Sequence, residues 1–229
     1  MKSIQLSPNS LNLFLECPLC FWLEKNSGIK RPLAYPYEFN KKMDELLKEE
    51  FDLYRKKDLE HPLFGENNIN AKLFKNQKLL NQWRSNLAGI RYFDQDLEAT
   101  LFGAVDDVLD FGKAGIAPLD YKSTGMAISK IYDRFQLQMD IYTFLMEKNG
   151  YKTTGRGYLA FYVVDKNRGF IDRLPFNKEI IEIETNLSDI YEIFKEAVML
   201  LKSQRPKKHS KDCQFGKWFE AIKTSDFNN

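Results

Sequence analysis

The feature that most constrains the fold is an uninterrupted apolar run at residues 157–164 (GYLAFYVV). A strand with one face in solvent alternates apolar and polar residues, whereas a strand covered on both faces is apolar throughout. The run therefore predicts a central strand, buried on both faces. A helix is expected just before it, because apolar residues recur at helical spacing over residues 131–145 and end at the stop signal Asn149-Gly150.

Apolar spacing and helix breakers place the other elements. Ser7 and Pro8 form a helix start, and Cys17-Pro18 kinks or restarts that helix, because proline lacks the backbone donor. Helices are expected from about residue 37 into the fifties, over 77–87 and over 178–201, with two or three strands in 98–122, a strand at 170–174, a helix cap at Ser129 or Ser123-Thr124, and loops at 25–36 and 60–70. This order predicts an α/β or α+β domain with a mixed central sheet flanked by helices.

The length and composition favour one domain. The chain has 229 residues, of which 43% are hydrophobic, and this is enough for one sizeable core. We expect an N-terminal helical part over about 1–90, a core over about 91–201 and a C-terminal basic, cysteine-containing tail over about 202–229.

Charge and hydropathy exclude some classes of protein. A net charge of +2 lacks the broad basic field of a passive nucleic-acid binder, although a nuclease needs only a local basic groove. No apolar run approaches the ~20 residues that span a membrane, and no signal-peptide core begins the chain, so a soluble cytoplasmic protein is expected. A basic cluster is either a solvated tail or a phosphate-contacting patch: Lys202, Arg205, Lys207, Lys208 and Lys211.

Two short segments carry the strongest chemical signal. Residues 103–106 (GAVD) and 118–122 (PLDYK) flank a short turn at 112–115, which predicts a hairpin whose side chains meet. Asp106 and Asp120 would then form a site for a hard divalent cation, and Lys122 lies two residues after Asp120 on the same strand face. A metal beside a lysine suits phosphodiester cleavage, because the metal polarises the phosphate and lowers the pKa of a water. The alternative is an ordinary charged surface strand.

Four stretches in order resemble the PD-(D/E)xK nuclease superfamily, in its RecB-like branch. The chain is similar there to the nuclease domains of RecB and AddB and to CRISPR-associated RecB-like exonucleases. The stretches are the opening segment 6–18 with Phe21 after its Cys-Pro, the G-x-x-D of 103–106, the D-x-K of 120–122 and the Q-x-x-x-Y of 138–142. The resemblance implies a restriction-endonuclease-like core with N-terminal helical additions.

The same resemblance implies roles for particular residues. Asp106 and Asp120 would bind Mg²⁺ or Mn²⁺ together with the backbone carbonyl of Tyr121, and Lys122 would be the catalytic lysine. Asp107 is the alternative to Asp106, but adjacent strand residues point in opposite directions, so we expect Asp107 to face away.

The fourth stretch places two polar side chains on one helix face. Gln138 and Tyr142 are four residues apart, so both can reach the site from the helix that follows Lys122. Gln138 would orient Lys122 or bind phosphate, and Tyr142 would bind phosphate or stack on a base. In the alternative interpretation Tyr142 is a core residue and Gln138 is exposed.

The chain departs from the family pattern at an early helix. Many RecB-like nucleases have a histidine ligand there, whereas this chain has Asp44 as the candidate oxygen ligand. The alternative is an exposed helix charge. His61, in a polar loop, is interpreted as a surface histidine.

The cysteines are the second departure. Several relatives bind an iron–sulfur cluster through four cysteines, but this chain has only Cys17, Cys20 and Cys213. With His209 they would form a zinc site that joins the two ends of the chain. The alternative is three ordinary buried thiols, and three cysteines do not make a disulfide framework.

We therefore expect a metal-dependent DNA nuclease, an exonuclease on single-stranded DNA or DNA ends in repair, recombination or defence. The chain carries no helicase motor, so unwinding would need a helicase or another repair or defence protein as partner. Two alternatives stay open: a catalytically inactive nucleic-acid-binding module on the same fold, and a protein-interaction domain whose motifs are coincidental.

Overall fold

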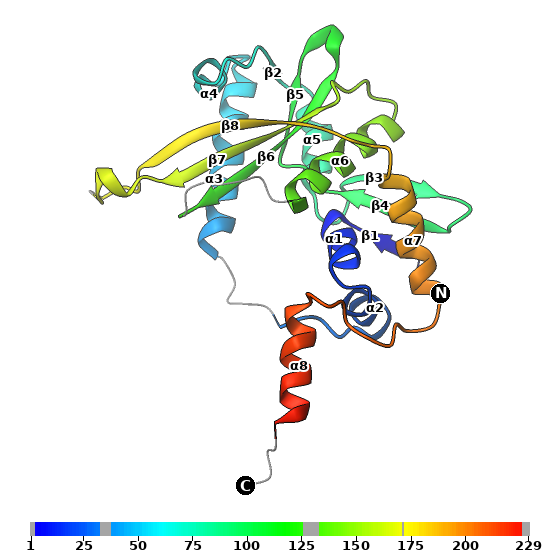
Figure 1. Ribbon diagram of the computed structural model, residues 1–229. Helices are drawn as coiled ribbons and strands as arrows, with labels where there is room; N and C mark the ends of the chain where they lie inside the picture. Colours follow the sequence, from blue (N-terminus) through cyan, green and yellow to red (C-terminus); the bar gives the residue numbers. More distant parts are fainter. Residues whose placement is uncertain (1–2, 33–37, 126–132, 171, 226–229) are drawn as a thin grey trace. The chain divides into compact units, whose positions relative to one another are not determined.

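The computed structural model describes residues 3–32, 38–125, 133–170 and 172–225 (Figure 1). The chain forms two compact units. Unit 1 contains residues 1–35, 93–101 and 191–229, and unit 2 contains residues 36–92 and 102–190. The expected cap Ser129 lies outside the described residues. The expected single domain with its three parts stays a prediction.

Unit 2 is built on a five-stranded mixed sheet. Its strand order is β2-β5-β6-β7-β8, with β6 and β7 parallel and the other neighbouring pairs antiparallel. The strands are β2 (Lys72–Leu73), β5 (Asp107–Asp110), β6 (Ile116–Thr124), β7 (Arg156–Val164) and β8 (Phe176–Glu184). Together with its helices, this sheet confirms the predicted mixed α/β, restriction-endonuclease-like fold.

Strand β7 confirms the prediction from the apolar run. It pairs with β6 on one side and β8 on the other, and its residues 157–162 are buried. Helix α6 (Asp133–Lys148) packs against it and ends at Asn149-Gly150, as expected. Gly157 allows this close approach, because a Cβ there would lie 2.8 Å from the Cβ of Met139.

The two faces of the sheet are covered by different helices. On one face, Tyr121 of β6 packs against Phe51 of α3 (Glu38–Lys56), with ring centroids 4.9 Å apart. On the other face, Lys122 of β6 contacts Gln138 of α6. Side chains alternate along a strand, so α3 and α6 cover opposite faces of the sheet (Figure 1). Helix α5 (Gln77–Arg84) also contacts β5 and ends three residues before the predicted Leu87.

Two predictions for the segment around strand β8 were wrong. No described strand covers 170–174, and the predicted helix over 178–201 is strand β8 in its first part and helix α7 (Ile190–Lys202) in its second. Ile180 and Ile183 are three residues apart, which fits a helix period. They are nevertheless β-branched residues in a strand that pairs with β7 along its whole length, and tertiary pairing decides such cases.

His61 corrects another prediction. The segment 60–70 contains the short helix α4 (Pro62–Glu66), and His61 caps it by accepting a hydrogen bond from the backbone N–H of Leu63 at 3.2 Å. Its ring is 2% exposed and stacks on Phe51 at 3.9 Å between centroids. The prediction of a surface histidine was therefore wrong.

Unit 1 combines terminal helices with β1 (Ile4–Leu6), which pairs in parallel with β4 (Ala99–Gly103). The order of the small sheet is β1-β4-β3, with β3 at Ile90–Asp94, and the division between the units falls within β3 and β4. Helix α1 (Pro8–Glu16) is capped by Ser7, and helix α2 (Pro18–Ser27) restarts at Pro18, extending into the predicted loop. The C-terminal segment, expected as a tail, contains helix α8 (Gln214–Thr224).

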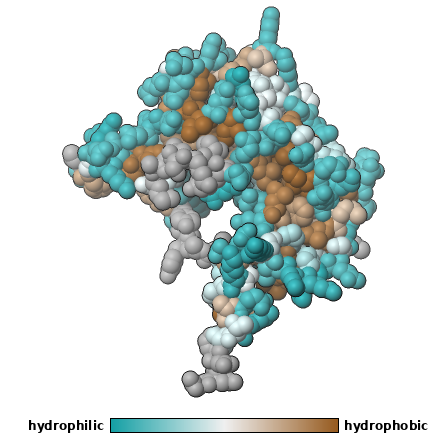
Figure 2. Space-filling model, viewed as in Figure 1, coloured by the Kyte–Doolittle hydropathy of each residue, from teal (hydrophilic) through white to brown (hydrophobic). Residues whose placement is uncertain are grey.

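The surface is mixed in character. Hydrophilic side chains cover much of the face in Figure 2, with apolar patches between them, and this agrees with 34 basic and 32 acidic residues in the chain. Among the described residues, no helix combines the length and the apolar character needed to cross a membrane.

Candidate active site

The hairpin of β5 and β6 brings Asp106 and Asp120 together in unit 2. Asp106 directly precedes β5, and Asp107 pairs with Leu119 across the hairpin. The backbone N–H of Tyr121 donates to Asp106 Oδ2 at 3.1 Å. The Asp106 side chain is 18% exposed and that of Asp120 only 3%. Asp106 is therefore partly accessible to solvent, whereas Asp120 is buried.

Asp120 has an unusual electrostatic environment. Burial, and then the charge of Asp106, raises its pKa to about 7. Lys122 opposes this shift through an ion pair with Asp120 Oδ2. Asp120 is thus partly protonated near neutral pH when no divalent cation is present.

Gln138 connects the buried carboxylate to the lysine. Its Nε2 donates to Asp120 Oδ1 at 2.8 Å and to the hydroxyl of Tyr142 at 2.8 Å. Its Oε1 accepts from Lys122 Nζ at 3.2 Å. The amide is therefore fully engaged, which fits an orienting group better than a solvent-exposed side chain.

Tyr142 links this hydrogen-bond network to the backbone before β5. It is 4% exposed, and its hydroxyl donates to the carbonyl of Ala104 at 2.7 Å. A ring this buried cannot stack on a base in the present conformation, and the hydroxyl of Tyr142 instead accepts the hydrogen bond from Gln138 Nε2. Gly103 makes room for the ring, because a Cβ at that position would lie 2.7 Å from a Tyr142 ring carbon.

Helix α3 contributes an acidic and a basic residue to the edge of the site. Asp44 and Lys48 lie one turn apart, and Lys48 Nζ is 2.7 Å from Asp44 Oδ2 and 2.8 Å from Asp106 Oδ1. Burial and the charge of Asp106 raise the pKa of Asp44. Burial alone would lower the pKa of Lys48, but the charges of Asp106 and Asp44 raise it, so Lys48 stays cationic.

Asp44, Asp106 and Lys122 line an open pocket of about 300 Å³, whereas Asp120 and Gln138 are not among its lining residues. Its lining residues are Asn40, Asp44, Leu47, Asp106, Tyr121, Lys122 and Ser123. Carboxylates and a lysine thus converge on a space that is open to solvent, where an anionic substrate can approach.

Asp107 faces away from this pocket, as the strand alternation predicts. It is fully buried, ion-pairs with Arg55, and receives hydrogen bonds from Arg84 Nη2 at 3.0 Å and the Tyr121 hydroxyl at 2.8 Å. Arg84 Nε also donates to the backbone carbonyl of Asp106 at 2.6 Å. The buried ionic cluster therefore holds the start of β5, and with it the Asp106 backbone.

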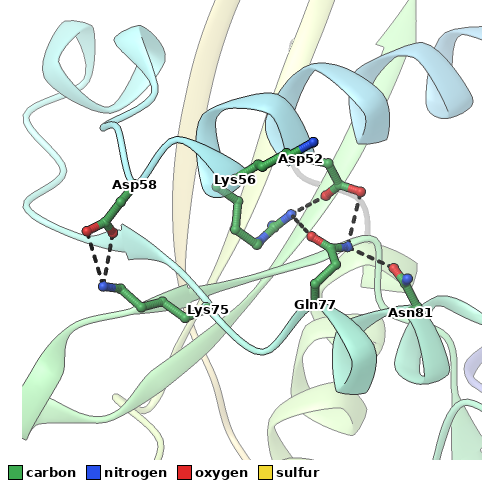
Figure 3. Close-up of a pocket in the computed structure, with 7 residues that line it drawn as sticks. Asp52, Lys56, Asp58, Lys75, Gln77 and Asn81 are labelled. Atoms are coloured by element: carbon green, nitrogen blue, oxygen red, sulfur yellow. Dashed lines mark hydrogen bonds and ion pairs between the residues drawn. The ribbon is translucent and has the colours of Figure 1, made fainter.

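Asp52 extends the cluster toward a second pocket. It ion-pairs with Arg55 and with Arg84, the latter at 2.8 Å, and accepts from Gln77 Nε2 at 3.1 Å. Figure 3 shows Asp52 and Gln77 facing each other, with the Lys75–Asp58 ion pair to one side. Four of the charged residues that line this pocket form ion pairs, Asp52 with Arg55 and Asp58 with Lys75, so the pocket does not indicate a separate ligand.

Comparison with known proteins decides the family. The sequence model of the PD-(D/E)XK nuclease superfamily matches residues 5–218. The chain belongs to that superfamily. Metal-dependent nucleases, typically using Mg²⁺ or Mn²⁺, are characteristic of it. The RecB-like branch stays a prediction.

Other comparisons add little to the PD-(D/E)XK assignment. A solved structure titled "Crystal structure of SSO0001" shares 14% sequence identity and covers 90% of this chain and 81% of that one. Its TM-score of 0.44 is too low to support further conclusions. None of the curated proteins compared with this sequence matches it.

In this PD-(D/E)XK chain the chemical type of the donors suits a hard divalent cation, although among the described residues the three aspartates do not bring their oxygens within 4.8 Å of one another. Asp44, Asp106 and Asp120 offer carboxylate oxygens, the ligand type that Mg²⁺ and Mn²⁺ prefer. Asp120 Oδ2 is buried and, within the described residues, accepts no hydrogen bond, although Lys122 ion-pairs with it. A cation beside it would offset the cost of burying this charge. That the backbone carbonyl of Tyr121 also binds the metal stays a prediction.

Sequence reasoning missed Lys48, Arg55, Arg84 and Asp52. Lys48 had a usable signal, because it lies four residues after Asp44 and so shares its helix face. The two arginines had no such signal. They reach Asp107 from α3 and α5, at sequence separations of 52 and 23 residues.

In unit 1 the structure brings together Cys17, Cys20, His209 and Cys213. Their ligand atoms all lie within 4.8 Å of one another. Cys20 lies in helix α2, and the other three residues lie next to the helices α2 and α8.

Proposed function

We propose that this PD-(D/E)XK chain is a metal-dependent deoxyribonuclease that uses Asp106, Asp120 and Lys122. The observation that carries the proposal is the hydrogen-bonded chain from Lys122 through Gln138 to Asp120, next to Asp106 and an open pocket. A structural salt bridge would not need a glutamine that bridges its two partners.

The position of each residue in the site suggests its role in the reaction. Asp106 and Asp120, with Asp44 from α3, would hold the divalent cation, which when bound polarises the phosphate and lowers the pKa of a water. Lys122, at the pocket, orients the attacking water or stabilises charge that builds on the phosphate. Gln138 orients Lys122 and Asp120, and Tyr142 positions Gln138.

The finer assignment rests on the motif order. Residues 103–106, 120–122 and 138–142 follow each other as in RecB-like exonucleases. We therefore propose exonuclease action on single-stranded DNA or DNA ends, in repair, recombination or defence, with a separate helicase supplying unwinding.

The test is cleavage of end-labelled single- and double-stranded DNA with Mg²⁺, Mn²⁺ or EDTA. Wild type should cleave with metal and stop in EDTA, and Lys122→Met should lose about 100-fold or more of the rate. Lys113→Met, which changes an exposed turn lysine, is the matched control and should cleave normally. Products shortened stepwise from an end would support the exonuclease assignment, and internal cuts on circular DNA would contradict it.

One observation favours the inactive binding module. Lys48 Nζ lies between Asp44 and Asp106, so an ammonium already neutralises two of the proposed ligands. DNA binding in EDTA by folded protein that binds no Mn²⁺ and cleaves nothing would establish this alternative. Mn²⁺ binding that is lost in Asp120→Ala would exclude it.

A further inference from the structure

The cluster in unit 1 joins residues from opposite ends of the chain. Cys17 precedes α2 and Cys20 lies in its first turn, whereas Cys213 caps α8 and His209 lies in the segment before it. Cys17 and His209 are 192 positions apart in the sequence. Their convergence cannot result from local chain geometry.

The three cysteines are buried free thiols. Cys17, Cys20 and Cys213 are 0%, 6% and 4% exposed, and none forms a disulfide. The apolar cluster around them is small, with Leu19 in its core and Leu13, Leu23 and Phe215 at its edge. So few apolar side chains contribute little to holding the chain ends together.

The spacing of the ligand atoms matches a tetrahedron around one ion. Zinc bonds of about 2.3 Å to sulfur and about 2.0–2.1 Å to nitrogen require tetrahedral edges of about 3.8 Å between sulfurs and about 3.6 Å between sulfur and nitrogen. His209 Nδ1 lies 3.5 Å from Cys17 Sγ, 3.4 Å from Cys20 Sγ and 3.7 Å from Cys213 Sγ. Cys20 Sγ and Cys213 Sγ are 3.6 Å apart.

We propose that Cys17, Cys20, His209 and Cys213 bind a single structural zinc ion that holds α2 and α8 together. In an iron–sulfur cluster each ligand binds a different iron, so the ligand atoms spread around the cluster. Here all four approach one point. A closed tetrahedral set of three thiolates and an imidazole is a structural zinc site.

Gly216 leaves the space that the His209 side chain occupies. A Cβ at this position would lie 2.5 Å from the Cβ of His209 and 2.7 Å from its Cγ, so a side chain at 216 would collide with the imidazole. Gly216 also donates its backbone N–H to Cys213 Sγ at 3.4 Å. The missing side chain at 216 is therefore part of the site, because it makes space for His209.

Arg31 supplies a compensating charge. Three thiolates around a divalent ion leave a net negative charge, and Arg31 Nη2 donates to Cys213 Sγ at 3.6 Å. The guanidinium also ion-pairs with Glu16 at 2.5 Å and lies over the ring of Phe215 at 5.0 Å. Partners outside the ligand set orient the ligands of metal sites in this way.

The first experiment is metal analysis of the purified full-length protein. We expect about one zinc per chain and no stoichiometric iron, and replacement with Co²⁺ should give the spectrum of tetrahedral thiolate coordination. Iron with inorganic sulfide, or folded protein that neither contains nor takes up zinc, would overturn the proposal. Asp120→Asn should keep its zinc, and this separates the site from the proposed active site.

Variants test the ligand set. His209→Ala and Cys213→Ser should lower bound zinc at least about fivefold, whereas His209→Cys should retain it, because thiolate replaces imidazole in zinc sites. His61→Gln, which changes the histidine in unit 2, is the control and should keep its zinc. If Cys213→Ser does not fold, Gly216→Ala remains informative, because it leaves all four ligands but displaces His209 and should weaken zinc binding. Equal zinc content in His209→Ala and wild type would overturn the assignment.

Discussion

Lys48 Nζ lies 2.8 Å from Asp106 Oδ1, so the ammonium of a helix residue pairs with the carboxylate that begins the β5–β6 hairpin. The same ammonium is 2.7 Å from Asp44. A divalent cation bound by these carboxylates would have to displace or repel Lys48.

Lys48→Met should therefore tighten binding of Mn²⁺ by about tenfold, because it removes a competing positive charge near the ligands. The measurement is titration calorimetry in the absence of DNA. Lys42→Met, an exposed lysine of the same helix, is the control and should leave the affinity unchanged. Weaker binding in Lys48→Met would mean that the lysine organises the ligands.

The pKa of Asp120 gives a pH prediction for metal-free protein. Its pKa is raised from 3.8 to about 7 on folding, so the folded state binds the proton more tightly than the unfolded state. The contribution of this carboxyl to stability is complete below about pH 4 and is lost as the pH rises to about 7. In EDTA, Asp120→Asn should have a higher free energy of unfolding than wild type at pH 8, and the difference should disappear near pH 4.

Urea unfolding at several pH values measures this difference. If the difference in free energy of unfolding between wild type and Asp120→Asn were the same from pH 4 to pH 8, the raised pKa of Asp120 would be contradicted. With Mn²⁺ present the order at pH 8 should reverse, because the cation stabilises the ionised carboxylate.

Gln138→Leu should lower cleavage by about 10- to 100-fold, the usual effect of removing a group that orients metal ligands. Asp120 Oδ1 loses its donor, and Lys122 loses an acceptor. Gln136→Leu, two residues earlier on the same helix, is the matched control, because Gln136 contacts Asp140 and not the site. Normal cleavage by Gln138→Leu would place Gln138 outside the catalytic machinery.

Arg55→Met should destabilise the fold by about 3–5 kcal/mol, because it leaves the fully buried Asp107 without one of its charged partners. Tyr121→Phe removes one hydrogen bond to the same carboxylate and should cost about 1–3 kcal/mol. Lys75→Met, which breaks an exposed ion pair, should have little measurable effect on the free energy of unfolding. Urea denaturation compares the three, and equal effects would mean that the buried cluster contributes no more than surface charges.

Local patterns explain why part of the site could be predicted. Asp106 and Asp120 belong to one hairpin with a short turn, and Gln138 and Tyr142 belong to one helix face. In both cases the distance along the chain limits the distance in space. Strand β8 was missed because Ile180 and Ile183 fit a helical period as well as a strand, and only pairing with β7 separates the two.

The sequence by itself determined the elements whose partners are close along the chain: the hairpin with its acids and lysine, the buried strand β7, and the helix carrying Gln138. Only the tertiary structure decided that Lys48 forms an ion pair with Asp106, and that Arg55 and Arg84 form ion pairs with the buried Asp107. The same holds for the burial of His61. It also decided that Cys17 and Cys20 meet His209 and Cys213 within 4.8 Å. Short-range order follows from backbone geometry and hydrophobic spacing, whereas contacts across many residues depend on how whole elements pack, which no local pattern records.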